Sequence, residues 1–423
     1  MSYTFGIEYE TLIVLPPHLK EQLNPAQADK FQIISEFLKG RGIPASDVDK
    51  QDTWYVDADL TVYHRTTGTY KDLFKPKVVL KDGDVTNGIE IISPPFTCKQ
   101  GMEAIDQFAT AIEPISFHNT STSTHIHYSF PGLDFRDNIA AVCKIYLTWW
   151  YFEPIIMKLV PCWRRRDNIY CKPIRQCVET KFSDLHENER APMIQALFSN
   201  DMSFIMSMLF EKGLPTADEV IAFFQYSWIP PGADLTDPFV NELSRTRMTA
   251  INFFNIIKGK DDYTAPTGTI EVRIKHGSTD ATEIQKYIQF FATFIRRALT
   301  QNVDAFLDRN YENTNFSYRE VLINVDQDPM IHFNILTQFM ENPTLMSYFA
   351  PRLPALSKDT DVDLFTAPQS GGKLFSRRRK SKLIASDETI RYKNKVRRVH
   401  VGPRGGKYIK VQGVMQSLTK LGL

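Results

Sequence analysis

The segment Phe5-Gly6-Ile7-Glu8-Tyr9-Glu10, near the start of the chain, places apolar side chains at every second position. A period of two predicts a β-strand with one buried apolar face. The opposite face carries Glu8 and Glu10, about 7 Å apart. Carboxylates at this spacing repel each other and need either a cation between them or open water. What this strand does therefore depends on the ligands that other segments supply.

Several later segments also predict strands with polar side chains on one face, separated by helical patterns over 26–39, 100–112, 137–159 and 282–299. The polar residues are Asp57, Asp59 and Thr61 in 54–62, Glu90 in 88–92, His125 and His127 in 124–129, and Glu271, Arg273 and Lys275 in 268–275. Carboxylate-rich ligation favours hard cations such as Mg²⁺ or Mn²⁺, and Mn²⁺ tolerates an imidazole ligand more readily.

Each pattern also has an ordinary interpretation. Alternating charges on a strand usually form a solvated face, and a His-x-His pair is more often two surface histidines than a metal site. Glu90 alone fits an edge strand as well as a ligand. The arginine run in Trp163–Cys171 is typical of a solvated loop, although guanidinium groups also suit phosphate and carboxylate.

Taken in order, these segments resemble the amidoligase family, which is related to glutamine synthetase and glutamate–cysteine ligase. The segments are Phe5–Glu10, Asp59–Thr61, Gly88–Pro95, Thr124–His127, Arg166–Cys171, Arg247–Asn252 and Thr269–Arg273. The resemblance spans about residues 1–300. Two departures are Thr124, where the family commonly has Gly before its His-x-His, and Thr61, where a Ser is usual. Neither removes an implied ligand.

The resemblance implies an α+β fold: a curved antiparallel β-sheet with helices packed on one face, as in the catalytic fold of glutamine synthetase. It also implies an ATP-dependent carboxylate–amine ligase. ATP would phosphorylate a substrate carboxylate, and an amine would displace phosphate from the acyl phosphate to leave an amide or isopeptide bond. Amino acids or peptides would supply the carboxylate and the amine. Mg²⁺ or Mn²⁺ would neutralise the phosphates.

The resemblance assigns metal ligands residue by residue. They are Glu8, Glu10, Glu90, His127 and Glu271. Glu8 and Glu10 would serve different metal ions, Glu90 lying on one side and His127 and Glu271 on the other. His125 would orient His127 or replace it as the ligand.

Four further residues receive roles in binding and catalysis. Arg273 would contact phosphate as the acyl phosphate forms, and Arg247 and Arg166 would bind phosphate or the substrate carboxylate. Asp59 would position or deprotonate the amine.

Two other functions compete with the ligase. A catalytically silent protein could bind a peptide or partner on the same fold, although the implied ligands are all present and would repel each other without a cation. A metal-dependent hydrolase could use His125 and His127, but the Glu271-x-Arg273 pair has no evident task in hydrolysis.

The net charge of +1 conceals an acidic body and a basic tail. Residues 371–423 hold 15 Lys+Arg against 2 Asp+Glu, a net of +13, which leaves a net of −12 for residues 1–370. We expect a catalytic domain over 1–350, a linker over 351–372 and a basic tail over 373–423 with a small hairpin around 403–406. The tail could contact nucleic acid, an anionic surface or the acidic body itself, or remain a solvated extension.

The ends of the chain and its cysteines give further expectations. The segment Gly402–Tyr408 is similar to short C-terminal modules of large DNA viruses, which suggests a viral protein. No signal peptide or membrane span is apparent, so we expect a cytoplasmic protein, or one in the host cytoplasm or virion if viral.

The five cysteines lack paired CxxC spacing and indicate neither a disulfide framework nor a zinc cluster. Related enzymes often form oligomers.

Overall fold

The structure is a computed structural model that describes most of residues 2–175 and selected later segments. The described residues are 2–20, 30–50, 52–59, 61–62, 88–118, 121–135, 137–165, 168, 170–175, 248–257, 267–303, 305–306, 328–356, 384–392, 395–401, 407–411 and 414–417. They fall into two compact units, Met1–Thr366 and Ala367–Leu423. No helix of the described residues is long and apolar enough to cross a membrane.

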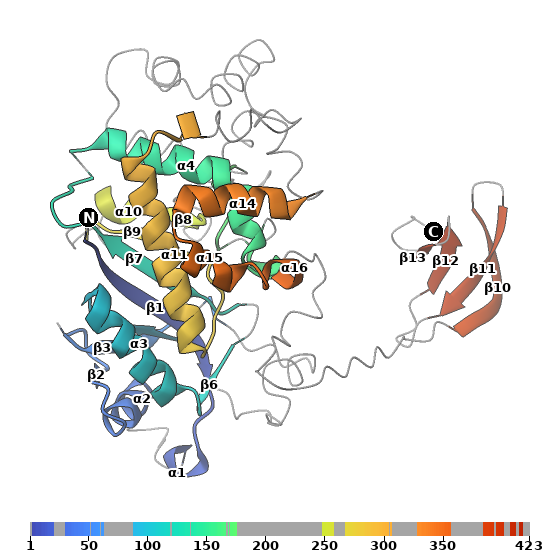
Figure 1. Ribbon diagram of the computed structural model, residues 1–423. Helices are drawn as coiled ribbons and strands as arrows, with labels where there is room; N and C mark the ends of the chain where they lie inside the picture. The colour runs from blue at the N-terminus through green and yellow to red at the C-terminus, as the bar shows by residue number, and fades with distance from the viewer. Residues whose placement is uncertain are drawn as a thin grey trace. The chain divides into compact units, whose positions relative to one another are not determined.

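The first unit contains a mixed sheet in which all pairs except β2 with β3 are antiparallel (Figure 1). Its main path runs β2-β3-β4-β1-β7-β9-β8, and β5 and β6 also pair with β1. The strands are β1 (Thr4–Ile13), β2 (Ala45–Ser46), β3 (Trp54–Ala58), β4 (Ile89–Ile92), β5 (Phe96–Thr97), β6 (Ser116–Phe117), β7 (Thr124–Ser129), β8 (Ile251–Asn252) and β9 (Ile270–Val272). The α+β class expected from the sequence is confirmed at this level.

The helices of this unit include three long ones that match the helical patterns of the sequence closely. These are α3 (Cys98–Ile112), α4 (Ile139–Lys158) and α11 (Ala281–Thr300). The remaining described helices are α1 (Pro17–Lys20), α2 (Lys30–Lys39), the 3₁₀ turn η1 (Cys162–Arg164), α10 (Phe254–Ile257), α14 (Pro329–Met340), α15 (Pro343–Phe349) and α16 (Leu353–Leu356).

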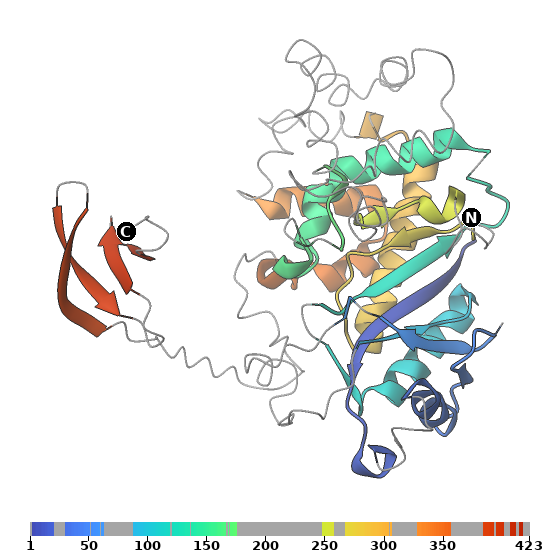
Figure 2. The same ribbon diagram turned by 180° about the vertical axis from the view of Figure 1, so that it is seen from behind.

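Helices α3 and α11 lie across one face of the sheet, and the view from behind shows β1 and β7 in front of them (Figures 1 and 2). Tyr9 of β1 meets Phe108 of α3 edge to face, with ring centroids 5.0 Å apart. Tyr128 of β7 donates a hydrogen bond of 2.9 Å to the Ile288 carbonyl of α11. Phe5 and Ile7 are also buried, so the apolar face of β1 lies in the core as its alternation predicts.

The second unit contains a four-stranded antiparallel sheet in the order β10-β11-β12-β13. Its strands are β10 (Ile384–Tyr392), β11 (Lys395–Val401), β12 (Lys407–Val411) and β13 (Val414–Ser417). Strands β11 and β12 pair on either side of residues 402–406, where the sequence predicts a hairpin. The predicted linker lies outside the described residues from residue 357 onward.

Two predicted strands differ from the observed elements. The strand expected over 268–275 is only Ile270–Val272, because the register with β7 changes beyond it. Ile126 pairs with Val272, whereas the next bridge joins Ser123 to His276, which leaves one extra residue on the second chain segment. Such a β-bulge ends regular pairing and redirects the following side chains. The strand expected over 54–62 ends at Ala58.

Gly101 marks a close approach of α3 to the sheet and gives a test of this packing. A Cβ at position 101 would overlap the ring of Phe5 and come within 2.7 Å of Phe96 Cβ. We predict that Gly101→Ala lowers the free energy of unfolding by about 1–3 kcal/mol through overpacking, despite the roughly 1 kcal/mol that Ala gains over Gly in a helix. Chemical denaturation would measure it.

Gly40→Ala is the matched control, because a Cβ there lies 3.4 Å from the Glu36 carbonyl, close to ordinary contact. Its effect should stay within about 0.5 kcal/mol. A Gly101→Ala variant as stable as this control would contradict the packing of α3 on β1.

Candidate metal and phosphate site

The face of the sheet opposite α3 and α11 carries the acidic and imidazole side chains predicted from the sequence. Antiparallel pairing brings them together because directly opposed residues project to the same side. The opposed pairs are Glu10 with Glu90, Glu8 with His125, and His127 with Glu271. Residues about 260 positions apart in the chain thus share one surface of the sheet.

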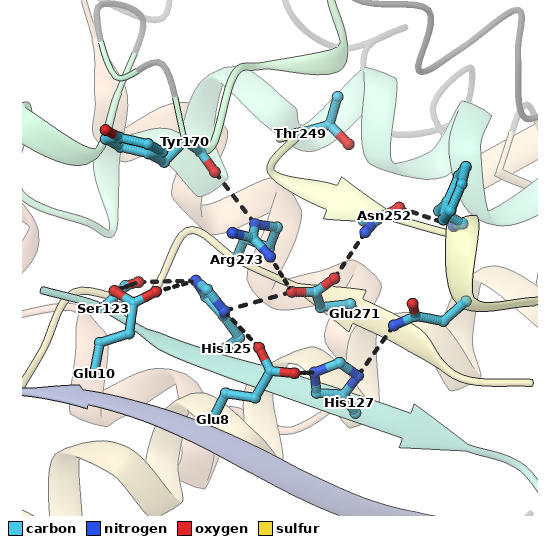
Figure 3. Close-up of polar contacts among 12 residues, drawn as sticks. Glu8, Glu10, Ser123, His125, His127, Tyr170, Thr249, Asn252, Glu271 and Arg273 are labelled. Atoms are coloured by element: carbon cyan, nitrogen blue, oxygen red, sulfur yellow. Dashed lines mark hydrogen bonds and ion pairs between the residues drawn. The ribbon is translucent and has the colours of Figure 1, made fainter. Parts of the chain in front are cut away.

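Glu8 lies between the two histidines of β7 (Figure 3). Its Oε1 is 2.9 Å from His127 Nε2, and its Oε2 is 2.9 Å from His125 Nδ1. Burial alone would raise the pKa of Glu8, but His127 and His125 together hold it well below its usual value. Burial would likewise lower the pKa of His127, yet Glu8 raises it. This pairing keeps Glu8 ionised.

Glu10 has a different electrostatic environment. It is buried, accepts a short hydrogen bond from Ser123 Oγ, and places Oε1 3.2 Å from His125 Nε2. Burial raises the pKa of Glu10; His125 opposes this effect and the nearby Asp59 adds to it. The ionised form of Glu10 is therefore disfavoured when no cation is bound.

Glu271 and Arg273 form an ion pair at the other end of the cluster. Asn252 Nδ2 donates a hydrogen bond of 2.7 Å to Glu271 Oε2. Although burial would raise it, Arg273 holds the pKa of Glu271 below its usual value. Arg273 Nε also donates to the Tyr170 carbonyl at 3.2 Å, so the guanidinium is fixed from two sides (Figure 3).

Three overlapping groups in this cluster have ligand atoms within 4.8 Å of one another, close enough to share a metal ion. The groups are Glu8, His127 and Glu271; Glu10, Asp59 and Glu90; and Glu8, Glu90 and His125. The first two share no residue. The arrangement can therefore accommodate two cations side by side, one near Glu8 and one near Glu10.

The donor set fits a divalent cation. His127 Nε2 is buried and lies 2.9 Å from Glu8 Oε1, but their relative orientation does not satisfy hydrogen-bond geometry. A nitrogen and an oxygen that face each other in this way can act as ligands of one ion. Repulsion between two ionised carboxylates about 4 Å apart costs about 4 kcal/mol near a protein surface, and a cation would remove that cost.

The structure also locates the other residues predicted to act here. Asp59 lies beside Glu10 and Glu90, and its Oδ1 accepts bonds of 2.7 Å from both the amide and the hydroxyl of Thr61. Its predicted role toward an amine stays a prediction. Arg166 and Arg247 lie outside the described residues.

Lys275 corrects one sequence interpretation. The strand pattern predicts that it shares a face with Glu271 and Arg273. Instead its Nζ lies 3.4 Å from Glu283 and 5.1 Å from the ring centroid of Tyr287, both in α11. The β-bulge before His276 is the physical reason, because one extra residue reverses the side to which a strand residue points.

Three residues of the site were not singled out by sequence reasoning. Ser123 connects Glu10 to His125, and Asn252 orients Glu271. Arg164 is buried, and its Nη2 donates to the Arg273 carbonyl. The sequence offers a weak signal for each, since Ser123 precedes the His-x-His strand, Asn252 ends a resembling segment and Arg164 belongs to the arginine run.

The contrasting pKa directions predict opposite effects of two substitutions without metal. At pH 7 in EDTA, Glu10→Gln should raise the free energy of unfolding by about 1 kcal/mol, because it removes a buried charge that the folded state disfavours. Glu271→Gln should lower it by about 3 kcal/mol, because Arg273 loses its buried partner. Urea denaturation would measure both, with the exposed Glu36→Gln as a control near zero.

The pH dependence provides a second check. The stabilisation from Glu271 is present above pH 4.5 and is lost as pH falls through its lowered folded-state pKa. The cost of Glu10 grows as pH rises from 4.5 through its raised folded-state pKa, so the benefit of Glu10→Gln should vanish in acid. Equal destabilisation by both substitutions at pH 7 would contradict these assignments.

Comparison with known proteins supports the resemblance seen in the sequence. The family described as "Putative amidoligase enzyme" matches residues 1–204, just under half of the 423 residues. The match contains Glu8, Glu10 and His127, whereas Glu271 and Arg273 lie beyond it and join the cluster through the sheet. A search of curated proteins finds no match. Over residues 1–204, the chain is therefore similar to the amidoligase family.

Proposed function

We propose that this protein is an ATP-dependent carboxylate–amine ligase that forms an amide or isopeptide bond through an acyl phosphate, on a glutamine-synthetase-like fold. The similarity of residues 1–204 to the amidoligase family supports a ligase. The observation that carries the finer proposal is the pair of three-ligand groups on one sheet face with the Arg273 guanidinium fixed beside one of them. Phosphoryl transfer needs this combination of divalent cations and a positioned cation of the protein.

Two sets of residues would hold Mg²⁺ or Mn²⁺. Glu8, His127 and Glu271 would bind one ion, and a set around Glu10 and Glu90 would bind the other. Bound ions would neutralise the phosphates of ATP and the charge that develops during transfer. We favour His127 over His125 as the ligand, because Glu8 already engages one ring nitrogen of His125 and Ser123 the other.

Arg273 would contact the transferred phosphoryl group. Its guanidinium is held by Glu271 and by the Tyr170 carbonyl, so its orientation is established before substrate binds. A preorganised charge of this kind stabilises a transition state without reorganisation at the moment of reaction. Arg166 and Arg247 remain proposed partners of phosphate or of the substrate carboxylate. Asp59 remains a proposed group for positioning or deprotonating the amine, and its place in the Glu10 group also suits a metal ligand.

The decisive measurement is ADP formation with ATP, Mg²⁺ and a panel of amino acids and peptides. We expect ADP to form only when both a carboxylate and an amine are present. Glu10→Gln and Glu271→Gln should reduce the rate by at least about 100-fold, because each removes a ligand on which charge stabilisation depends. The exposed Glu36→Gln should retain the wild-type rate.

The same assay separates the alternatives. Full activity in Glu10→Gln or Glu271→Gln would show that the metal assignment is wrong. Metal-dependent ester hydrolysis without ATP would favour a hydrolase. If saturating ATP and Mg²⁺ gave none of the roughly 2.7 kcal/mol of stabilisation expected at 100 times Kd, a silent binding protein would be favoured.

The basic tail supports a separate proposal about partners. Residues 371–423 carry a net charge of +13, and their described part forms the β10–β13 sheet. We propose that this unit binds nucleic acid electrostatically. The viral source suggested by the sequence stays a prediction.

Removal of residues 371–423 should abolish retention of the protein on DNA or RNA at about 50 mM salt, and raising the salt to about 200 mM should weaken retention of the full chain. Filter binding across a salt series would measure this. Unchanged retention after the deletion would reject the proposal.

A further inference from the structure

A buried carboxylate outside the candidate site organises the chain segment that leads to it. Glu153 of α4 is only 1% exposed. Its Oε1 accepts hydrogen bonds of 2.8 Å from Trp149 Nε1 and from the amide of Ile174, and its Oε2 accepts one of 2.9 Å from the amide of Arg175. Two backbone amides of the segment 170–175 thus donate hydrogen bonds to one carboxylate of α4.

Pro154, the next residue of α4, strengthens this attachment. Proline has no N–H, so it cannot donate the helical hydrogen bond to the carbonyl four residues earlier, that of Trp150. Arg175 Nε donates to that carbonyl instead, at 2.8 Å, and its guanidinium lies 4.9 Å from the Trp150 ring centroid. The segment 170–175 therefore docks where the hydrogen bonding of α4 is interrupted.

Hydrogen bonds connect the docked segment to Arg273. The amide of Lys172 donates to the Met248 carbonyl at 2.8 Å, and the amide of Ala250 donates to the Lys172 carbonyl at 2.7 Å. The amide of Arg273 donates to the Ala250 carbonyl at 3.0 Å, and Arg273 Nε donates to the Tyr170 carbonyl. Both the backbone and the guanidinium of Arg273 thus depend on the segment that Glu153 anchors.

We propose that Glu153 is a positioning residue, which holds the segment 170–175 on α4 and thereby orients Arg273 for phosphate. The catalytic part of this inference rests on the proposed ligase function. A carboxylate is needed because it presents an acceptor at each oxygen, whereas a carboxamide presents an NH₂ group at one of them. Burial raises the pKa of Glu153 to about 7, although the N–H donors oppose this effect, so the charge is costly to keep here.

Glu153→Gln tests the proposal by two independent measurements at pH 8. Hydrogen exchange followed by mass spectrometry should accelerate about tenfold at the amides of Ile174 and Arg175 and also at Lys172, Ala250 and Arg273. In the ligase assay, kcat should fall about tenfold while the KM for ATP changes less than twofold, because misplacement of Arg273 weakens an interaction made in the transition state.

Two further variants make the test robust. Thr148→Val is the matched control, because Thr148 is buried in the same helix and its hydroxyl donates to the Lys144 carbonyl of that helix, so its exchange and kinetics should equal those of the wild type. Arg175→Met removes the bond to Trp150 and keeps the amide bound to Glu153. Arg175→Met should also accelerate amide exchange and lower kcat, each by a smaller factor than Glu153→Gln does. It takes the place of Glu153→Gln in the test if that variant does not fold.

The outcomes separate the two proposals. Faster exchange confined to residues 174 and 175 would overturn the positioning role. Propagated exchange with wild-type kcat would overturn its link to catalysis. If the wild type formed no ADP with any amine, the proposed function would fail, and the exchange pattern would still decide whether Glu153 holds the segment that carries Arg273.

Discussion

Repulsion among carboxylates crowded on one face of a β-sheet is the constraint on which the site depends. Glu8, Glu10 and Glu271 converge there, and the neighbouring charged groups set the pKa of each carboxylate. Histidine supports Glu8, and Arg273 supports Glu271. The charge of Glu10 is stabilised less well, so burial raises the pKa of Glu10 above its ordinary value. A face with this imbalance gains most from a divalent cation, because the ion offsets the repulsion between neighbouring carboxylates.

The apolar packing of the other face of the sheet into the core offsets this repulsion between carboxylates. β1 pairs with β4 on one side and β7 on the other, so its two carboxylates stand on the best-supported strand. Phe5 and Tyr9 bury their rings against α3. A slip of one residue would move these rings to the polar face and the carboxylates into the core, so hydrophobic burial fixes the register of the site.

Arg273, the proposed phosphate-binding group, depends on structure far from it in the sequence. Its side chain contacts Glu271 two residues away, but its orientation also depends on the Tyr170 carbonyl, on Arg164 and on Ala250, the residue before β8. Tyr170 belongs to the segment 170–175, which docks on α4 where Pro154 leaves the Trp150 carbonyl without its helical donor. The site is thus supported by the sheet beneath it and by a backbone segment docked beside it.

Sequence alone determined the residue types on the polar strand faces and most of the regular elements that the structure describes. Alternation and helical spacing identified β1, β7, α3 and α11 because burial on one face imposes a period of two or 3.6 on the residues themselves. The same patterns placed Glu8, His127 and Glu271 on polar faces. Tertiary structure alone decided which faces meet, that Ser123 joins Glu10 to His125, that Lys275 turns toward α11, and that Glu153 anchors the segment beside Arg273. These features depend on pairing register, a β-bulge and backbone hydrogen bonds between distant segments, and such interactions leave no periodic trace in a single sequence.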